Sequence, residues 1–361
     1  NGRPVLSNPT GASITLADGL ITNNFDIIDS AVGIAGPGPS GNLSSPDRGA
    51  QASNIDIYRG PGYAGPTQGI AITAATGKAD FTKVNIGKIV GTGTAAQDWT
   101  MSSGSVLVDG GDPQVTFASG SIVNNHGHIL QVNDTTGGFV TLEAQAGQPF
   151  IENGKGILVE NAAGDVTVQN KVAGSTAAII KSDEDGINVN GSSGTQTFND
   201  IQVLASGTAG GAGYAGVNLQ NNAGSSQFNN LKIDLSDPTN AATGFYAVND
   251  NTIDVTGNSS VNVANAPAVS MTNVADANVN FTTVKSTQSP ARHRGRRIQR
   301  RHEPDRHRVA GRRPGGQELA RPARQGAGHD RDHGRGRRRR RHRPPEQQAR
   351  RLDGQPRQGR G

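Results

Sequence analysis

The chain has 361 residues, of which 50 are glycine and none is cysteine, and its formal net charge is +5. The lack of cysteine excludes a disulfide framework and any cysteine-based metal site. No apolar run reaches the roughly 18 residues that a membrane-spanning helix needs, and the first residues show no signal-peptide pattern. We therefore expect a fragment or mature segment that does not span a membrane.

The net charge is the sum of two unlike parts. Through Ser289 the chain carries 11 Lys and Arg against 23 Asp and Glu, and from Pro290 onward it carries 24 Arg against 7 Asp and Glu. The first part is acidic and rich in polar turn residues, whereas the second is strongly basic. Such a shift in composition predicts a boundary near residue 290.

Residues 1–68 are the least regular part of the acidic region. Apolar residues at positions 14–16, 25–28 and 54–57 predict short strands. A stretch rich in Gly and Pro runs from Gly36 to Pro46, and such a stretch is typical of a loop. We expect irregular N-terminal coils here, with one loop excursion.

One phrase recurs between residues 69 and 289: a small residue, an apolar residue, any residue, an apolar residue, any residue and Asn. Its clearest copies begin at Gly156, Gly186, Gly216, Gly244 and Ala268, which are 30, 30, 28 and 24 residues apart. An earlier copy begins at Gly69, and looser copies begin at Ser105 and Ile129. Alternating apolar residues indicate strands, and a period of this size indicates a repeat architecture.

A second phrase follows the first: Phe, two polar residues, an apolar residue, any residue and an apolar residue. It begins at Phe81, Phe198 and Phe228, with a partial copy at Phe281. On an unbroken strand Phe198 and Ile201 would point to opposite faces, so a bend is predicted between them. Each repeat would then hold three short strands in a coil of 24–30 residues. This cross-section predicts an all-β parallel β-helix over residues 69–289.

Stacked coils would bury the apolar positions of the first phrase, because no coil can bury its apolar face alone. The first predicted stack is Ile157, Ile187, Val217, Phe245 and Val269. The second is Val159, Val189, Leu219, Ala247 and Met271. Neighbouring coils would lie about 4.8 Å apart.

Four asparagines close the first phrase at one corner of the predicted coil. They are Asn161, Asn221, Asn249 and Asn273. Asn and Gly tolerate positive φ, which sharp turns often require, and amides in stacked coils can form a hydrogen-bonded ladder. We predict such a structural ladder; glycan binding by these side chains is the alternative.

Residues 290–361 contain no Lys, Ser, Thr, Asn, Phe, Tyr or Trp, and include five consecutive arginines from Arg337 to Arg341. A nucleic-acid-binding arm and a disordered basic tail are two interpretations. A translated frameshift is the third and the one we favour. Moving one base forward converts CGN codons for Arg into codons for Gly, Ala, Val, Asp or Glu. Suitable codons for Arg292 to Arg297 then spell Gly-Ile-Gly-Val-Val-Gly, which repeats the first phrase.

Acidic turns provide the candidate metal ligands. Asp109 and Asp112 flank two glycines, and Asp183 and Asp185 belong to an Asp-Glu-Asp run. Carboxylates in loops are typical Ca²⁺ ligands, although a solvated turn is the simpler interpretation. A metal pair of His126 and His128 has no third ligand nearby in the sequence, and a solvated loop is the alternative. We expect no other cofactor.

The two phrases and the corner asparagines resemble those of bacterial secreted right-handed β-helix proteins. That group includes autotransporter-like surface passengers and pectin-lyase-like polysaccharide enzymes. The resemblance implies a right-handed parallel β-helix and an extracellular or cell-surface location. Its enzymes place carboxylates beside a basic residue, but the polygalacturonase motifs are absent, and residues 126–128 invert the Gly-His-Gly motif. Before residue 290, the only arginines are Arg3, Arg48 and Arg59.

These observations favour a non-catalytic structural or adhesive segment of a bacterial surface or secreted protein. Polysaccharide or cell-surface glycans are the partners that this interpretation suggests. A polysaccharide lyase or glycoside hydrolase on the same scaffold is the first alternative, with Asp183 to Asp185 as the best carboxylate cluster. Nucleic-acid binding through the basic tail is the second alternative, and we do not expect it.

Overall fold

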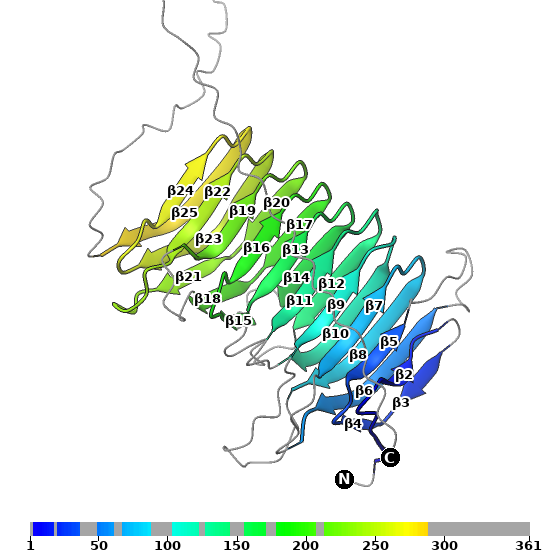
Figure 1. The fold of residues 1–361 in the computed structure, drawn as a ribbon. Coiled ribbons are helices and arrows are strands. Elements are labelled where there is room, and N and C mark those ends of the chain that lie inside the picture. The colour runs from blue at the N-terminus through cyan, green and yellow to red at the C-terminus, as the bar shows by residue number, and fades with distance from the viewer. Residues whose placement is uncertain are drawn as a thin grey trace, which may run out of the picture. The chain divides into compact units, whose positions relative to one another are not determined.

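The computed structural model describes residues 3–17, 20–36, 49–60, 67–87, 103–122, 127–144, 155–170, 178–206 and 213–287. These residues form a parallel β-solenoid without a helix (Figure 1), which confirms the predicted all-β fold class. Within these ranges no helix has the length and apolar character needed to cross a membrane. The predictions for residues 290–361, including disorder, concern residues outside the described ranges.

The copies of the first phrase form one parallel sheet together with two earlier strands, β2 (Ala12–Thr15) and β5 (Val32–Gly36); the sheet has ten strands, one from each successive coil (Figure 1). Each strand pairs with the equivalent strand of the coil before it and of the coil after it. The other strands are β7 (Gln68–Thr73), β9 (Gly104–Asp109), β11 (His128–Asn133), β13 (Ile157–Glu160), β16 (Ile187–Asn190), β19 (Ala215–Gln220), β22 (Thr243–Val248) and β24 (Val269–Thr272).

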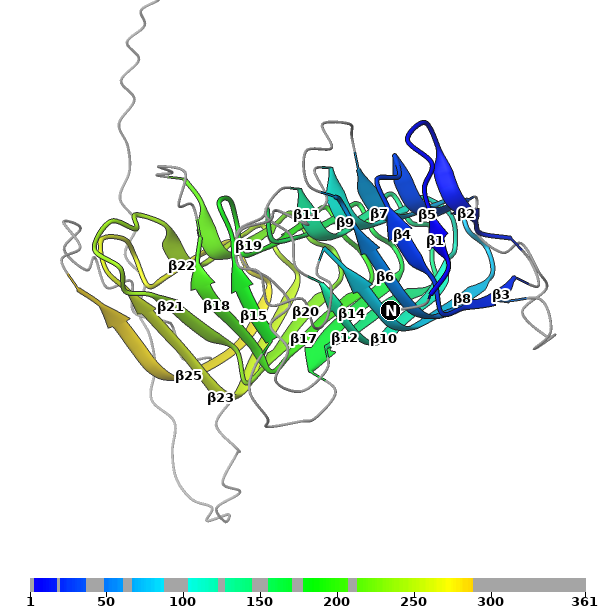
Figure 2. The same ribbon diagram turned by 90° about the horizontal axis from the view of Figure 1, so that it is seen from below.

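The copies of the second phrase belong to a parallel sheet of fifteen strands that covers the other two sides of the coil (Figure 2). Some strands cover both sides, because they continue through a bend. The strands are β1 (Val5–Leu6), β3 (Ile21–Asn23), β4 (Asp26–Ile28), β6 (Ala50–Tyr58), β8 (Lys78–Ile86), β10 (Gln114–Ile122), β12 (Phe139–Ala144), β14 (Asp165–Asn170), β15 (Ala178–Lys181), β17 (Thr195–Asn199), β18 (Ile201–Ala205), β20 (Ser225–Asn229), β21 (Lys232–Leu235), β23 (Thr252–Val263) and β25 (Asp276–Ser286).

A single left-handed residue makes the bend that the second phrase predicts. Asp200 lies between β17 and β18 with a φ of 56°, and Asn230 lies between β20 and β21 with a φ of 57°. The bend reverses the alternation of side chains, so Phe198 and Ile201 are both buried. The predicted bend between these two residues is therefore confirmed.

The core is built from stacks of equivalent side chains. Both stacks predicted from the first phrase are confirmed by the register, which pairs Ile157 with Ile187 and Ile187 with Val217. In the second sheet the rings of Phe198 and Phe228 stack with centroids 5.2 Å apart and 13° between their planes. Buried aliphatic side chains from the three sides fill the space between the sheets, so each coil is stabilised mainly by its neighbours.

The number of residues per coil varies more than the sequence predicts. It is 20 residues from Ala12 to Val32, 36 residues from Val32 to Gln68 and 36 residues from Gln68 to Gly104. The last of these steps lies in the region for which 24–30 residues were predicted, so that prediction is wrong there. From Gly104 to Val269 the step stays within the predicted 24–30 residues. The long steps contain residues 37–48, 61–66 and 88–102, which lie outside the described ranges. The strands before residue 69 nevertheless join the same two sheets as those that follow.

The small residue that opens the first phrase lies where the third side of the coil leaves no room for a side chain. A Cβ atom on Gly216 would lie 2.7 Å from Ile233 Cγ2 and 2.8 Å from the carbonyl oxygen of Gly244. The φ of Gly216 is not in the left-handed region, so space is the reason for glycine here. Ile129 occupies the same row and is fully buried, so the small residue is not required in every coil.

Candidate functional site

The corner asparagines have the conformation that their position in the phrase predicts. Their φ values are 52° for Asn161, 57° for Asn221, 56° for Asn249 and 54° for Asn273. Asn adopts this left-handed conformation more readily than most other residues with a side chain. The positive φ at this corner therefore favours Asn or Gly, independently of any hydrogen bond that the side chain makes.

The side chains of this corner bond from one coil to the next. Asn249 Nδ2 donates to Asn221 Oδ1 over 3.2 Å, and Asn273 Nδ2 donates to Asn249 Oδ1 over 3.1 Å. At the other end of the row, Asn161 Nδ2 donates to Asp134 Oδ1 over 3.0 Å. Gly191 interrupts the row, and a Cβ there would lie 2.5 Å from Asn161 Oδ1.

Replacing Asn249 with alanine is expected to destabilise the protein by about 1–2 kcal/mol, because it removes a hydrogen bond and places alanine in a left-handed conformation. Asn249→Gly is expected to cost less, since glycine tolerates this φ. Urea unfolding followed by circular dichroism measures both changes. Equal losses for the two variants would show that the left-handed backbone does not contribute to the choice of Asn.

A second polar row lies inside the same corner. Ser192 N donates to Asn222 Oδ1 over 2.9 Å. Asn222 donates to Asp250 Oδ1 from its backbone N over 3.0 Å and from its Nδ2 over 2.7 Å. All three residues are buried. Burial raises the pKa of Asp250, against the effect of the bonds from Asn222.

The raised pKa of Asp250 predicts a stability that depends on pH. The folded carboxyl group holds its proton more tightly than the unfolded one, whose pKa is near 3.8. The stabilisation that this carboxyl group contributes to the folded state is therefore complete below about pH 4. It is lost as the pH rises through the pKa of the folded state. Asp250→Asn keeps an acceptor for Asn222 and removes the buried charge, so the free energy of unfolding should fall less steeply with rising pH.

Urea unfolding of both proteins at several values between about pH 4 and pH 7 measures this slope. Asp237→Asn is the control, because hydrogen bonds from Thr239 lower the pKa of Asp237, which is exposed. This control should not flatten the fall. An unchanged slope in Asp250→Asn would contradict the assignment of the slope to Asp250.

Asp185, one of the predicted Ca²⁺ ligands, is a buried acceptor that joins two coils. Its Oδ1 accepts a 2.6 Å hydrogen bond from Ala215 N. Its Oδ2 accepts bonds of 2.8 Å each from Asn188 Nδ2 and Asn218 Nδ2. Burial raises the pKa of Asp185, although these bonds oppose the shift. Both oxygens thus face N–H donors, a setting that suits an acceptor of hydrogen bonds better than a metal ligand.

Three ionisable side chains from successive coils lie together beside Asp185. Lys155 Nζ lies 3.0 Å from Glu184 Oε1, and His128 Nδ1 lies 3.2 Å from the carbonyl oxygen of Lys155. Burial lowers the pKa of His128; the charge of Glu184 opposes this shift and that of Lys155 adds to it. A carboxylate, an ammonium group and an imidazole with a lowered pKa are groups that acid–base chemistry uses.

The individual sequence positions did not suggest this charged row, and His128 lies on strand β11 rather than in the solvated loop given as one alternative. Its partner His126 lies outside the described residues. Alignment of the first phrase would have brought His128, Lys155 and Asp185 together, since each precedes the opening position of a copy. Glu184, the partner of Lys155, lies one residue before Asp185. Asp183 is half-buried and directly precedes Glu184 in the chain.

The other predicted Ca²⁺ ligands lie at the corner after β9. Asp109 ends that strand and pairs with Asn133 in the register of the sheet. Asp112 follows three residues later, where its backbone N donates to the carbonyl oxygen of Ala75. Among the described residues, no group of three or more His, Asp or Glu side chains is arranged to hold a metal ion. Ca²⁺ binding at these turns stays a prediction.

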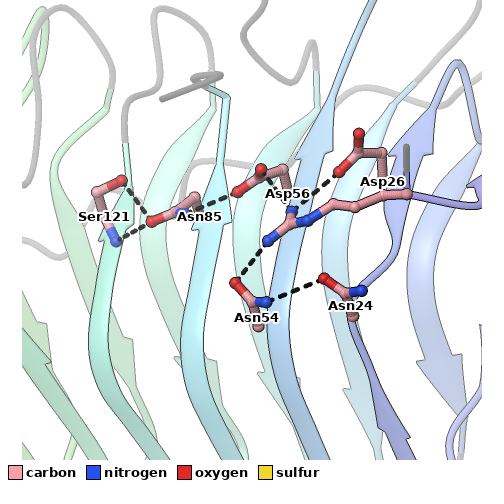
Figure 3. A network of polar contacts seen from close by, with 7 residues as sticks. Asn24, Asp26, Asn54, Asp56, Asn85 and Ser121 are labelled. Carbon is pink, nitrogen blue, oxygen red and sulfur yellow. Dashed lines mark hydrogen bonds and ion pairs between the residues drawn. The ribbon is translucent and has the colours of Figure 1, made fainter. Parts of the chain in front are cut away.

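A separate polar network crosses the outer face of the N-terminal coils (Figure 3). Arg3 Nη1 lies 3.0 Å from Asp26 Oδ1 and 2.8 Å from Asp56 Oδ2. Asp56 Oδ1 accepts a 2.7 Å bond from Asn85 Nδ2, and Asn85 Oδ1 accepts a 2.8 Å bond from Ser121 Oγ. The arginine therefore neutralises two carboxylates from adjacent coils, which sequence spacing alone did not reveal.

A shallow hollow lies on the outer face of strands β3, β6, β8 and β10. Its volume is about 250 Å³, somewhat below the roughly 300–1,000 Å³ of small-molecule sites. Hydroxyl, amide and carboxylate groups supply most of its lining side chains. They belong to Thr22, Gln51, Ser53, Asp80, Thr82 and Thr116, together with Ile21, Ala52 and Phe81.

Comparisons of the chain with protein-family models, curated proteins and solved structures found no match. The parallel solenoid is shown by the structure, whereas membership of a bacterial β-helix family stays a prediction. Function is therefore inferred from the geometry alone.

Proposed function

We propose that the solenoid is a non-catalytic structural or adhesive segment of a bacterial cell-surface or secreted protein. The proposal is supported mainly by the hydrogen bonds that the buried carboxylates of the solenoid accept. Asp56, Asp185 and Asp250 each accept a hydrogen bond from a residue of a neighbouring coil. Groups committed in this way hold successive coils in register, as a rigid display scaffold requires.

The hollow over β3, β6, β8 and β10 supports the adhesive part of the proposal. Gln51, Thr82 and Thr116 are among the polar residues that line it. Amides, hydroxyls and carboxylates are the groups that hydrogen-bond sugar hydroxyls. A polysaccharide or a cell-surface glycan is therefore the ligand class that this hollow fits best.

Binding of the full chain to an array of bacterial and host glycans tests this proposal. Replacing both Gln51 and Thr82 with alanine should lower the affinity for any bound glycan at least about tenfold, since each substitution removes a hydrogen bond. Gln227→Ala is the matched control, because Gln227 is exposed on β20, outside the hollow. Equal binding by all three proteins would remove the hollow as the adhesive site.

A carbohydrate-active enzyme is the second candidate, and the charged row of His128, Lys155 and Glu184 favours it. Incubating the chain with soluble polysaccharides and measuring new reducing ends tests for turnover. Turnover that disappears in Glu184→Gln or His128→Asn, but persists in the matched control Glu160→Gln, would replace the structural proposal with the enzymatic one. Glu160 is a half-buried carboxylate on β13.

A further inference from the structure

The C-terminal face of the described stack has the form of an interior surface. It consists of strands β24 and β25, and each of them pairs with only one other described strand. The other backbone edge of each strand is a row of N–H and C=O groups without a described strand beside it. Such an edge accepts a further strand readily.

Apolar side chains continue the core stacks up to this face. Val269 and Met271 continue the two stacks of the first phrase, and Val279 and Phe281 belong to the second sheet. All four are only partly buried, and Val284 is 53% exposed. The residues that pair with these side chains in the preceding coil are all buried. They are Phe245, Ala247, Val255, Ser259 and Val261, of which Ser259 pairs with Phe281.

Polar side chains of the last coil donate hydrogen bonds to the coil before it. Asn273 Nδ2 donates back to Asn249, Asn278 Nδ2 donates back to Asp254 over 2.8 Å, and Thr282 Oγ1 donates back to Asn258 over 3.2 Å. Their donors are thus engaged with the coil before. In the same row Asn249 Oδ1 accepts from the next coil, so Asn273 Oδ1 is the equivalent acceptor and this face fits a partner that supplies amide donors.

We infer that this face is the docking surface for one further parallel coil, encoded by the second reading frame of the codons for residues 292 onward. The preceding step of the repeat is 24 residues, from Gly244 to Ala268. The same step from Ala268 ends at Arg292. There the shifted frame permits Gly-Ile-Gly-Val-Val-Gly, with its isoleucine and first valine aligned with Val269 and Met271.

The permitted phrase also matches the corner chemistry of the solenoid. Its last residue is glycine, at the position that Gly191 occupies in the row of corner residues. Its first residue is glycine, as at Gly186, Gly216 and Gly244. A covalently linked coil also docks without the loss of translational freedom that a separate molecule incurs. The proposed occupant is therefore a continuation of the chain in the second reading frame rather than a second copy.

The coding DNA provides the first test. The second frame must spell apolar residues at both aligned positions and continue without a stop codon through at least one coil. A stop codon or polar residues at these positions would overturn the inference. This outcome does not depend on whether any variant folds.

The second test compares the chain as it is with a chain whose residues after 289 are translated from the second frame. Hydrogen exchange of the amides in β24 and β25 should slow at least about tenfold in the shifted chain, because their free edge becomes paired. A matched control carries aspartate in place of the isoleucine and first valine of the new coil, and it should lose this protection. Equal exchange in all three chains would refute the docking surface.

A second copy is the competing occupant of this face. If it were the true one, the chain as it is would form dimers or filaments whose amount rises with concentration, and β24 and β25 would become protected in them. Light scattering after size-exclusion chromatography, combined with hydrogen exchange at two concentrations, detects this result. It would overturn the proposed coil.

Discussion

Gly216→Val is expected to destabilise the protein by about 3–4 kcal/mol, near the upper limit for an overpacked core. The new Cβ would lie 2.7 Å from Ile233 Cγ2 and 2.8 Å from the carbonyl oxygen of Gly244. The first contact belongs to a fully packed side chain and the second to the backbone of the next coil. Neither can move without shifting a strand, so the strain is not relieved by a rotamer change.

Urea unfolding of the variant measures this loss. Gly11→Ala is the control, since the atom nearest to its Cβ would be Asn8 Nδ2, the end of a side chain, at 3.2 Å. This control should lie within about 0.5 kcal/mol of the unchanged protein. A Gly216→Val protein as stable as the control would show that the third side of the coil does not approach Gly216 as closely as described.

Asp185→Ala is expected to cost about 3–5 kcal/mol, because it leaves buried N–H donors without an acceptor. The donors are Ala215 N, Asn188 Nδ2 and Asn218 Nδ2. They come from two different coils, so the loss affects the contact between coils as well as a single turn.

Asp185→Asn should cost less, since its carbonyl oxygen can still accept from Ala215 N, although its amide group faces the two other amides. Glu160→Ala on the half-buried outer face of β13 is the control and should change the free energy of unfolding by less than about 0.5 kcal/mol. If Asp185→Ala were as stable as this control, the carboxylate would not be a coil-to-coil contact. Its availability for Ca²⁺ would then need to be tested directly by calorimetry.

The sequence predicts the parts of this fold that depend on nearest neighbours in the chain. Alternation of apolar residues predicts the strands, and the conflict between Phe198 and Ile201 predicts the bend. Repetition of the phrase predicts which side chains stack. These features follow from local geometry, because a strand has a period of two residues and a stack needs only equal spacing.

The candidate site depends on which coils are neighbours, and spacing alone did not show this. Lys155 and Glu184 are distant in sequence but form an ion pair, because they lie in adjacent coils. Arg3 and Asp56 meet for the same reason across two coils. The coil lengths before residue 104 vary between 20 and 36 residues, so no fixed period could have placed the N-terminal network.

Unequal coil lengths mean that the length of the solenoid is counted in coils and not in residues. The step from Val32 to Gln68 uses 36 residues and the step from Gly104 to His128 uses 24, yet each advances the first sheet by one strand. Extra residues between strands leave every register unchanged, whereas one residue inserted within a strand would turn its apolar face outward. Genetic variation can therefore lengthen the turns of a single coil freely, while the strands and their register in the two sheets stay the same.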